Sequence, residues 1–156
     1  WNPAVEDQAT DRAWRIGLFG DEIESIVDIA IRYDLAGMIA TNTTVSRDGL
    51  KTKNIDGIGA GGLSGKPLTD RSTNVVLTIH RHSKGKLPII GVGGIFTAED
   101  AFEKIAAGAS LLQAYTGFVY GGPTFAVEIN RGLAAILEKR GFASLDEASG
   151  SGMSHT

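Results

Sequence analysis

The amino-acid sequence predicts an α/β fold in which helices alternate with parallel strands. Three short apolar runs, at residues 38–40, 87–92 and 111–115, suit buried strands, and each leads into polar or glycine residues. Amphipathic patterns of helical period lie before, between and after these runs. Because right-handed crossovers place the carboxyl ends of parallel strands on one side, we expect the residues after the strands to meet at one face.

The composition is that of one globular domain with a hydrophobic core. The chain has 156 residues, a formal net charge of −3 and 42% hydrophobic residues. It contains no run of the roughly 18 apolar residues that span a bilayer and no signal-peptide pattern, so we expect this chain to be soluble. Its mildly acidic charge gives no basic surface for nucleic acid. The absence of cysteine excludes disulfides and thiolate metal sites.

The first half of the chain contains one clear helix, one strand and a long loop. Residues 1–20 show no sustained period, so we expect an irregular segment or a truncation edge. Residues 21–33 carry apolar side chains at helical spacing and lead into the strand at residues 38–40. A glycine-rich loop over residues 45–70 follows, of a length that is usually functional or disordered. Asp70 or Ser72 can then cap a second helix that ends near residue 83.

The second half contains the best-specified helix. Thr97 and Asp100 form a variant of the capping box, and Gly108 suits the position just after the helix end. A long final helix is expected after Pro123. Residues 142–156 suggest a frayed tail with at most one short turn, over residues 145–148. Three strands cannot close an eight-stranded barrel, so the sequence predicts either part of a barrel or an open sheet.

Gly93 and Gly94 mark a candidate phosphate site. They end a buried strand shortly before the helix that opens at Thr97, and glycine lets the backbone approach a ligand closely. The start of a helix offers unpaired N–H groups and the positive end of a dipole. A second glycine-bearing strand end, containing Tyr115 and Thr116, strengthens this interpretation. The alternative is that the two glycines only form a tight turn.

Other candidate groups lie at the first strand end and in the second helix. Asn42 presents donors and an acceptor in one plane, which suits the edge of a heterocycle or carboxylate, unless it forms a cap or an Asx turn. His80 and His82 point to different faces of a helix and suit a solvated surface. No serine triad, HExxH motif or carboxylate pair is evident, so catalysis would depend on a bound cofactor.

Five runs of the sequence stand out together, in a fixed order and spacing: ATNTTVSR from Ala40, GGLSGKPL from Gly61, LPIIGVGGI from Leu87, EKIAAGASLLQ from Glu103 and AYTGF from Ala114. These runs resemble the C-terminal half of dihydroorotate dehydrogenase, over about residues 21–148. The stretches SGKPL and AYTGF and the ending GFASLDEA resemble its quinone-dependent, membrane-associated class.

This resemblance implies a (β/α)8 barrel flavoprotein with FMN at the carboxyl ends of the strands. The implied reaction, in pyrimidine biosynthesis, is oxidation of dihydroorotate to orotate, with hydride passing to the flavin and electrons then to a quinone. The intact oxidoreductase would be peripheral at the inner membrane. Residues 21–141 would form the C-terminal half of the barrel, flanked by the irregular residues 1–20 and the tail at 142–156.

The resemblance also assigns residues to the site. Asn42 and Thr43 would hydrogen-bond orotate. Thr41, Ser64 and Gly65 would contact the flavin, and Leu68 would pack nearby. The FMN phosphate would be held by Val92, Gly93 and Gly94, with Tyr115 and Thr116 completing the seat. No metal site is implied.

Some parts of the family pattern are missing from this chain. The catalytic serine lies upstream of the matching runs, and Arg15 stands where the family has a flavin-contacting lysine. The helices that form the quinone tunnel are also absent, and residues 1–20 look unlike the family. We therefore expect this chain alone to be catalytically impaired. The alternatives are a non-catalytic half-barrel that binds a phosphate-bearing ligand or self-associates, and another FMN or sugar-phosphate barrel enzyme.

Overall fold

The computed structural model describes residues 20–48, 50–52, 55, 57, 59 and 61–152. The predictions for residues 1–19, including Arg15, and for residues 153–156 lie outside this part. In chain order the elements are α2 (Gly20–Arg32), β1 (Met38–Ala40), the 3₁₀ helix η2 (Lys66–Leu68), α3 (Thr69–Ser83), β2 (Ile89–Val92), α4 (Ala98–Ala106), β3 (Leu111–Gln113), α5 (Thr116–Gly121), α6 (Phe125–Arg140) and α7 (Leu145–Ala148).

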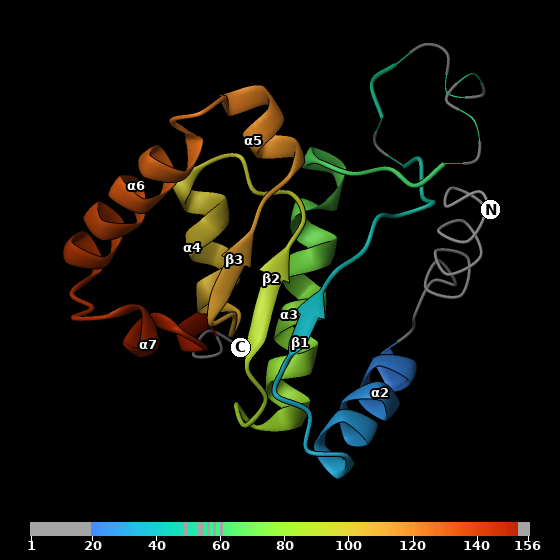
Figure 1. The fold of residues 1–156 in the computed structure, drawn as a ribbon, viewed down its shortest axis with the longest axis vertical. Coiled ribbons are helices and arrows are strands. Elements are labelled where there is room, and N and C mark those ends of the chain that lie inside the picture. Colours follow the sequence, from blue (N-terminus) through green and yellow to red (C-terminus); the bar gives the residue numbers. More distant parts are fainter. Residues whose placement is uncertain are drawn as a thin grey trace.

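The three strands form one parallel sheet in the order β1-β2-β3. Helices α3 and α4 lie against one face of this sheet, with α2 packed on α3 and α6 packed on α4 (Figure 1). The alternation of helices and parallel strands is therefore as predicted. All three carboxyl ends point to the same side of the molecule, where the loops after the strands gather.

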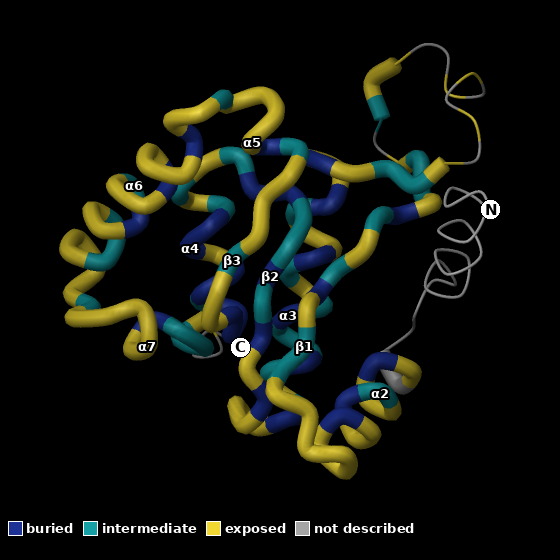
Figure 2. The backbone as a smooth tube through the Cα atoms, viewed as in Figure 1, coloured by how far each residue is buried: buried dark blue, intermediate teal, exposed yellow. Residues whose placement is uncertain are grey.

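The core lies between the sheet and its helices. Apolar residues of α2, α3, β2 and α4 are fully or nearly fully buried there, and Figure 2 shows the buried positions concentrated behind the strands. The periodic apolar face predicted for residues 21–33 contributes directly, because Val27 is 0% exposed and Ala30 is 2% exposed. Burial of this face stabilises the contact between α2 and α3.

The opposite face of the sheet is open. Ile39 pairs with Ile90, and Ile90 pairs with Leu111, so the three side chains form one row on this face. Ile39 and Leu111 are 61% and 63% exposed, so the prediction that all strands are buried is wrong for β1 and β3. In the described part of the chain, helices lie against only one face of the sheet, and Ile39 and Leu111 on the other face stay largely exposed.

The capping residues predicted for α4 are confirmed, whereas those predicted for α3 are wrong. Thr97 and Asp100 form the predicted capping box, and Gly108 follows the end of α4 with φ +116°. Neither Asp70 nor Ser72 caps α3, because that helix begins at Thr69 as a continuation of η2. The short helix α5 was not predicted.

Residues 142–152 pack against the body of the domain. Ser144 caps α7 by accepting a hydrogen bond from the N–H of Glu147, and Ala148 is fully buried. The N–H of Gly150 donates to Ile105 O at the end of α4. The prediction of a frayed tail is therefore wrong for this described part of the segment.

The two histidines of α3 differ in their surroundings. His80 is half-buried, and side chains added at Gly108 or Gly150 would collide with its ring, so the solvated surface predicted for it is wrong. The His82 ring instead contacts a carboxylate, since its Nε2 lies 2.8 Å from Asp28 Oδ1 on α2. His80 thus contributes to packing, whereas His82 links two helices at the surface.

Candidate functional site

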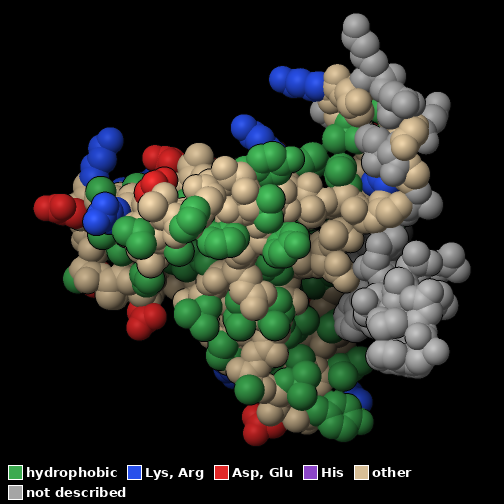
Figure 3. Space-filling view, turned by 45° about the horizontal axis from the view of Figure 1, so that its top comes forward, with side chains coloured by type: hydrophobic (Ala, Val, Ile, Leu, Met, Phe, Trp, Pro, Cys, Tyr) green, Lys and Arg blue, Asp and Glu red, His purple; other side chains and the backbone are tan. Residues whose placement is uncertain are grey.

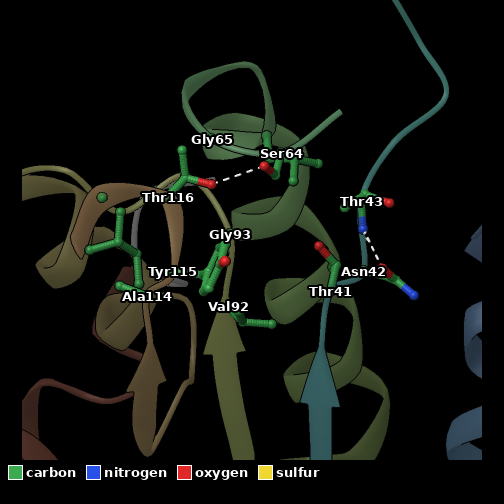
Figure 4. Close-up of a pocket in the computed structure, with 14 residues that line it drawn as sticks. Thr41, Asn42, Thr43, Ser64, Gly65, Val92, Gly93, Ala114, Tyr115 and Thr116 are labelled. Carbon is green, nitrogen blue, oxygen red and sulfur yellow. Dashed lines mark hydrogen bonds between the residues drawn. The ribbon is translucent and has the colours of Figure 1, made fainter. Parts of the chain in front are cut away.

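A pocket of about 330 Å³ lies at the carboxyl ends of the three strands (Figure 4). Every site residue singled out from the sequence lines it. These residues are Thr41, Asn42 and Thr43 after β1, Ser64, Gly65 and Leu68 before α3, Val92, Gly93 and Gly94 at the end of β2, and Tyr115 and Thr116 after β3. Ile95, Ala114 and Gly117 complete the lining and were not predicted, although each adjoins a predicted residue.

The end of β1 brings unpartnered hydroxyl groups to this pocket. Thr41 Oγ1 and Thr43 Oγ1 are buried, and neither has a hydrogen-bond partner within the described residues. A buried polar atom without a partner is costly, so both oxygens suit contact with a polar ligand. Thr43 and Asn42 lie on the side of the pocket away from Tyr115 and Thr116 (Figure 4).

Asn42 is partly engaged in a local hydrogen bond. Its Oδ1 accepts from the N–H of Thr43 at 2.7 Å, which agrees with the alternative that it stabilises a turn. The side chain is otherwise exposed, and its amide NH₂ group keeps two donors. Asn42 can therefore hold the local backbone and still present donors to a ligand.

The turn after β2 owes its two glycines to backbone geometry and packing. Gly93 and Gly94 have φ values of +104° and +70°, which favour glycine. A Cβ atom at position 94 would lie 2.4 Å from both Cα and N of Thr69. The tight-turn explanation therefore accounts for both glycines, and it leaves open whether the turn also binds a ligand.

The start of α4 carries its own acidic cap. Asp100 Oδ2 accepts hydrogen bonds from the N–H groups of Phe96 and Thr97, at 2.9 Å and 3.0 Å, and Thr97 Oγ1 accepts from the N–H of Asp100. The carboxylate also offsets the positive end of the helix dipole. The N–H groups of Phe96, Thr97 and Asp100 are therefore already bonded, and the phosphate site at Gly93 and Gly94 stays a prediction.

The peptide between Gly93 and Gly94 still presents a donor to the pocket. Gly93 O accepts from Ser72 Oγ of α3 at 2.9 Å. In a trans peptide the C=O and N–H groups point in opposite directions, so the N–H of Gly94 points away from α3. Gly94 lines the pocket, and its N–H has no acceptor in the described part of the chain. This N–H is therefore available to an anion.

The end of β3 is fastened to the segment before α3. Ser64 Oγ and Thr116 Oγ1 lie 2.9 Å apart, and the dashed line in Figure 4 crosses above Gly93. A Cβ at Gly65 would lie 3.0 Å from Thr116 Cγ2, so these two segments are also closely packed. Tyr115 is exposed to solvent, with 79% of its surface accessible.

The pocket has no strongly acidic or basic side chain in its lining. Its residues carry hydroxyl, amide and apolar groups only, with the Tyr115 phenol as the one ionisable group of the described lining. No cluster that could hold a metal ion occurs within the described residues. Such a lining can bind a ligand by backbone and neutral hydrogen bonds, and it offers no carboxylate or imidazole as a proton acceptor.

Comparisons with known proteins place this geometry in a family. Residues 18–137 match the family described as dihydroorotate dehydrogenase. The chain belongs to the dihydroorotate dehydrogenase family. It is 52% identical over 134 residues to dihydroorotate dehydrogenase (quinone) of Mycobacterium tuberculosis (strain ATCC 25618 / H37Rv), covering 86% of this chain and 38% of that protein.

A second relative extends the match towards the chain ends. The dihydroorotate dehydrogenase (quinone) of Crocosphaera subtropica is 53% identical over 154 residues, which cover 95% of this chain and 39% of the relative. This alignment reaches into residues 1–20, whereas the match to the family begins at residue 18. The chain spans a little more than a third of the length of these dihydroorotate dehydrogenase relatives.

The fold agrees with solved dihydroorotate dehydrogenase structures. The enzyme from Eimeria tenella in complex with ferulenol superposes with a TM-score of 0.83 at 35% identity, over 90% of this chain and 37% of that one. The three parallel strands with outer helices are therefore part of an α/β barrel, and the open-sheet alternative is not supported. No helix in the described ranges is long and apolar enough to cross a bilayer.

Proposed function

We propose that this protein contributes to the FMN-dependent oxidation of dihydroorotate to orotate with a quinone as acceptor, a step of pyrimidine biosynthesis. The described pocket would hold the phosphate end of FMN and part of the orotate site. The observation that carries this proposal is one pocket, in a chain of this family, that joins unpartnered threonine hydroxyls with a free backbone donor. Quinone access and peripheral contact with the inner membrane belong to the proposal for the intact enzyme.

The pocket residues fit a flavin phosphate. The N–H of Gly94, a residue of the pocket lining, has no acceptor in the described part of the chain, and Thr116 lies at the start of the short helix α5. In barrels of this kind, phosphate sites are frequently formed by the last two strand ends and a short extra helix. Val92, Gly93, Gly94, Tyr115 and Thr116 would hold the phosphate, and Ser64 and Gly65, with Leu68, would lie against the flavin.

The first strand end fits the polar edges of ring systems. Thr41 Oγ1 would donate to or accept from the flavin, which would satisfy a buried atom that has no described partner. Thr43 Oγ1 and the NH₂ group of Asn42 would bond orotate, whose carboxylate and carbonyl oxygens accept hydrogen bonds. The role of these residues is to orient the substrate ring and to exclude water from it.

The reaction requires a hydride acceptor and a proton acceptor. FMN supplies the two-electron acceptor when it is bound. The described pocket lining contributes no carboxylate, imidazole or amine, so the proton acceptor belongs to another part of the enzyme, in keeping with the serine that the family resemblance implies. We expect this chain alone to bind FMN without oxidising dihydroorotate, and measurable turnover would contradict that expectation.

The test is an absorbance and fluorescence titration of the purified protein with FMN. Saturable quenching of flavin fluorescence supports the proposed function, and the variant Thr41→Val should weaken the binding because it removes the unpartnered hydroxyl while keeping the side-chain shape. The matched control is Thr78→Val, because Thr78 Oγ1 bonds only Asn74 O on the exposed side of α3. No binding at high FMN concentration would overturn the proposal.

A second candidate function is that of a half-barrel that associates with another copy. The open sheet face favours it, because Ile39 and Leu111 expose a hydrophobic row there and hydrophobic side chains extend across this side of the molecule (Figure 3). Sedimentation equilibrium of the wild type and of Leu111→Glu distinguishes the cases. A dimer that the substitution dissociates supports self-association, and a monomeric wild type removes this candidate.

A further inference from the structure

Lys104 of α4 is a buried ammonium group close beneath the pocket. Its side chain is 0% exposed, and it is the largest fully buried side chain among the described residues. Nζ donates to Ser72 Oγ at 2.6 Å, to Thr73 Oγ1 at 2.9 Å and to Thr69 O at 3.4 Å. All three N–H donors of the ammonium are therefore used, and all three acceptors are neutral oxygens of the first turns of α3.

No carboxylate pairs directly with this charge. Asp100, Glu103 and Asp70 are near enough to favour the charged form of Lys104, yet none forms a salt bridge with it in the described part of the chain. Buried charges in proteins are usually paired or coordinated, so a cation held by neutral groups alone needs an explanation. The N-terminus of α3, which carries the positive end of its dipole, lies at the same place and adds to the local positive potential.

The hydrogen bonds that Lys104 donates determine the direction of the bond that Ser72 Oγ makes. An ammonium group can only donate, so Ser72 Oγ must accept from Lys104 and keeps its own proton for another acceptor. That proton is within reach of Gly93 O at 2.9 Å and of Thr69 O at 3.2 Å. Thr73 Oγ1 already donates to Thr69 O at 2.8 Å, which leaves Gly93 O as the acceptor with the better distance.

This series of hydrogen bonds leads from Lys104 through Ser72 to Gly93, which lines the pocket. With Gly93 O bonded to Ser72 of α3, the N–H of Gly94 in the same peptide points away from α3, and Gly94 itself lines the pocket. Hydrogen bonds in series polarise one another, so the positive charge of Lys104 strengthens the donor character of that N–H. Thr69 Oγ1 fastens the next carbonyl, Gly94 O, at 2.8 Å, so both peptides of the turn are held from α3.

We propose that Lys104 is a positioning residue for the phosphate of the bound flavin: through Ser72 it orients the Gly94 N–H towards that phosphate and supplies behind it a positive charge that no described carboxylate pairs directly. This inference rests on the proposed function, since it requires a phosphate-bearing ligand in the pocket. Lys104 does not line the pocket, so it acts through the turn and through the electrostatic field. The phosphate dianion would add to the negative charges of Asp100, Glu103 and Asp70, none of which pairs directly with Lys104.

The experiment compares FMN with riboflavin, which lacks the phosphate, as fluorescence-quenching ligands of the purified protein. The variant Lys104→Met replaces the ammonium by an apolar chain of similar volume, a change that buried sites often tolerate. We expect its dissociation constant for FMN to rise roughly tenfold while that for riboflavin stays unchanged. The control is Lys139→Met in the last turn of α6, where an exposed lysine is removed far from the pocket.

A second pair of variants tests the link through α3 and keeps the proposal falsifiable if Lys104→Met does not fold. Ser72→Ala leaves the charge in place and removes the bond to Gly93 O, so it should weaken FMN binding and spare riboflavin. Its control is Ser83→Ala, because Ser83 is also buried in α3 and bonds only His80 O. This pair separates the orientation of the turn from the loss of a buried hydroxyl.

The outcomes divide clearly. Selective loss of FMN affinity in Lys104→Met or Ser72→Ala supports the inference. Equal loss for both ligands shows a merely structural role and overturns it, as does unchanged FMN binding. If the wild type binds FMN more tightly than riboflavin and the variants keep the same ratio of the two dissociation constants, this inference alone is overturned. A wild type that binds neither flavin overturns the proposed function and the inference with it.

Discussion

Ser64 Oγ lies 2.9 Å from Thr116 Oγ1, although 52 positions separate the two residues in the chain. The bond joins the segment before η2 to the first residue of α5, and it crosses the pocket above Gly93 (Figure 4). Both hydroxyls belong to residues that line the pocket. Two segments of the proposed flavin site are thus held together by one bond between side chains.

We expect Ser64→Ala to weaken FMN binding because it releases this bond and removes a hydroxyl from the pocket. The loss of one hydrogen bond corresponds to about 1 kcal/mol, or roughly a fivefold rise in the dissociation constant. Fluorescence titration measures it. The matched control is Ser46→Ala in the same long loop, where Ser46 Oγ bonds Asp48 Oδ2 at 2.7 Å, away from the pocket. Equal effects of the two substitutions would contradict the expectation.

Gly94→Ala should destabilise the fold severely. The new Cβ would lie 2.4 Å from the backbone of Thr69, and the φ of +70° is unfavourable for alanine. Overpacking and left-handed backbone strain together correspond to about 3 kcal/mol or more. The control is Gly141→Ala, which shares a positive φ of +79° but has nothing within 4 Å of the added Cβ, so it should cost only about 1 kcal/mol. Urea unfolding of both variants measures the difference, and equal losses would show that the contact with Thr69 is unimportant.

The pocket residues at the strand ends could be predicted from topology, whereas Ser64, Gly65 and Leu68 were assigned only through the family resemblance. Apolar runs mark the strands, and parallel strands joined by helices put their carboxyl ends on one side. Thr41, Gly93 and Thr116 therefore meet although they are far apart in the sequence. The capping box at Thr97 was equally accessible, because it depends on two side chains three residues apart.

The parts that were missed depend on contacts between distant segments. A lysine in an amphipathic helix normally suggests the solvent side, and only the hydroxyls of α3, more than 30 positions away, hold Lys104 inside. The helix α5 is too short and too rich in glycine for a periodic signal. Asp100 was visible in the sequence as part of the capping box, and its negative charge disfavours an anion at the same end of the helix, which leaves the turn at Gly93 and Gly94 as the predicted phosphate site.

The stability of the protein should depend on pH through Lys104. Burial lowers the pKa of Lys104 from 10.5 to about 8, against the opposing effects of Asp100, Glu103 and Asp70. Between about pH 8 and 10.5 the unfolded chain binds the proton that the folded chain has lost, so the free energy of unfolding rises with pH in this window. The full effect corresponds to about 3 kcal/mol, and below about pH 8 the destabilisation is fully present.

The comparison of wild type with Lys104→Met isolates this contribution, since other groups titrate in both proteins. We expect the free energy of unfolding of the wild type, minus that of the variant, to increase as the pH rises from 7 to 10.5. Denaturant unfolding at a series of pH values gives the difference. A difference that stays constant over this range would show that Lys104 keeps the same proton affinity in the folded and unfolded states.

Thr97→Ala tests the proposal that the phosphate binds at the turn after β2 and not at the start of α4. The substitution removes the acceptor for the N–H of Asp100, and loss of such a cap costs about 1 kcal/mol of stability. Because the phosphate is proposed to bind at Gly94 and Thr116, FMN affinity should stay unchanged. Ser144→Ala, which removes the equivalent cap of α7, is the control for the stability effect. If Thr97→Ala instead altered FMN affinity and Ser144→Ala did not, the start of α4 would have to be part of the phosphate site.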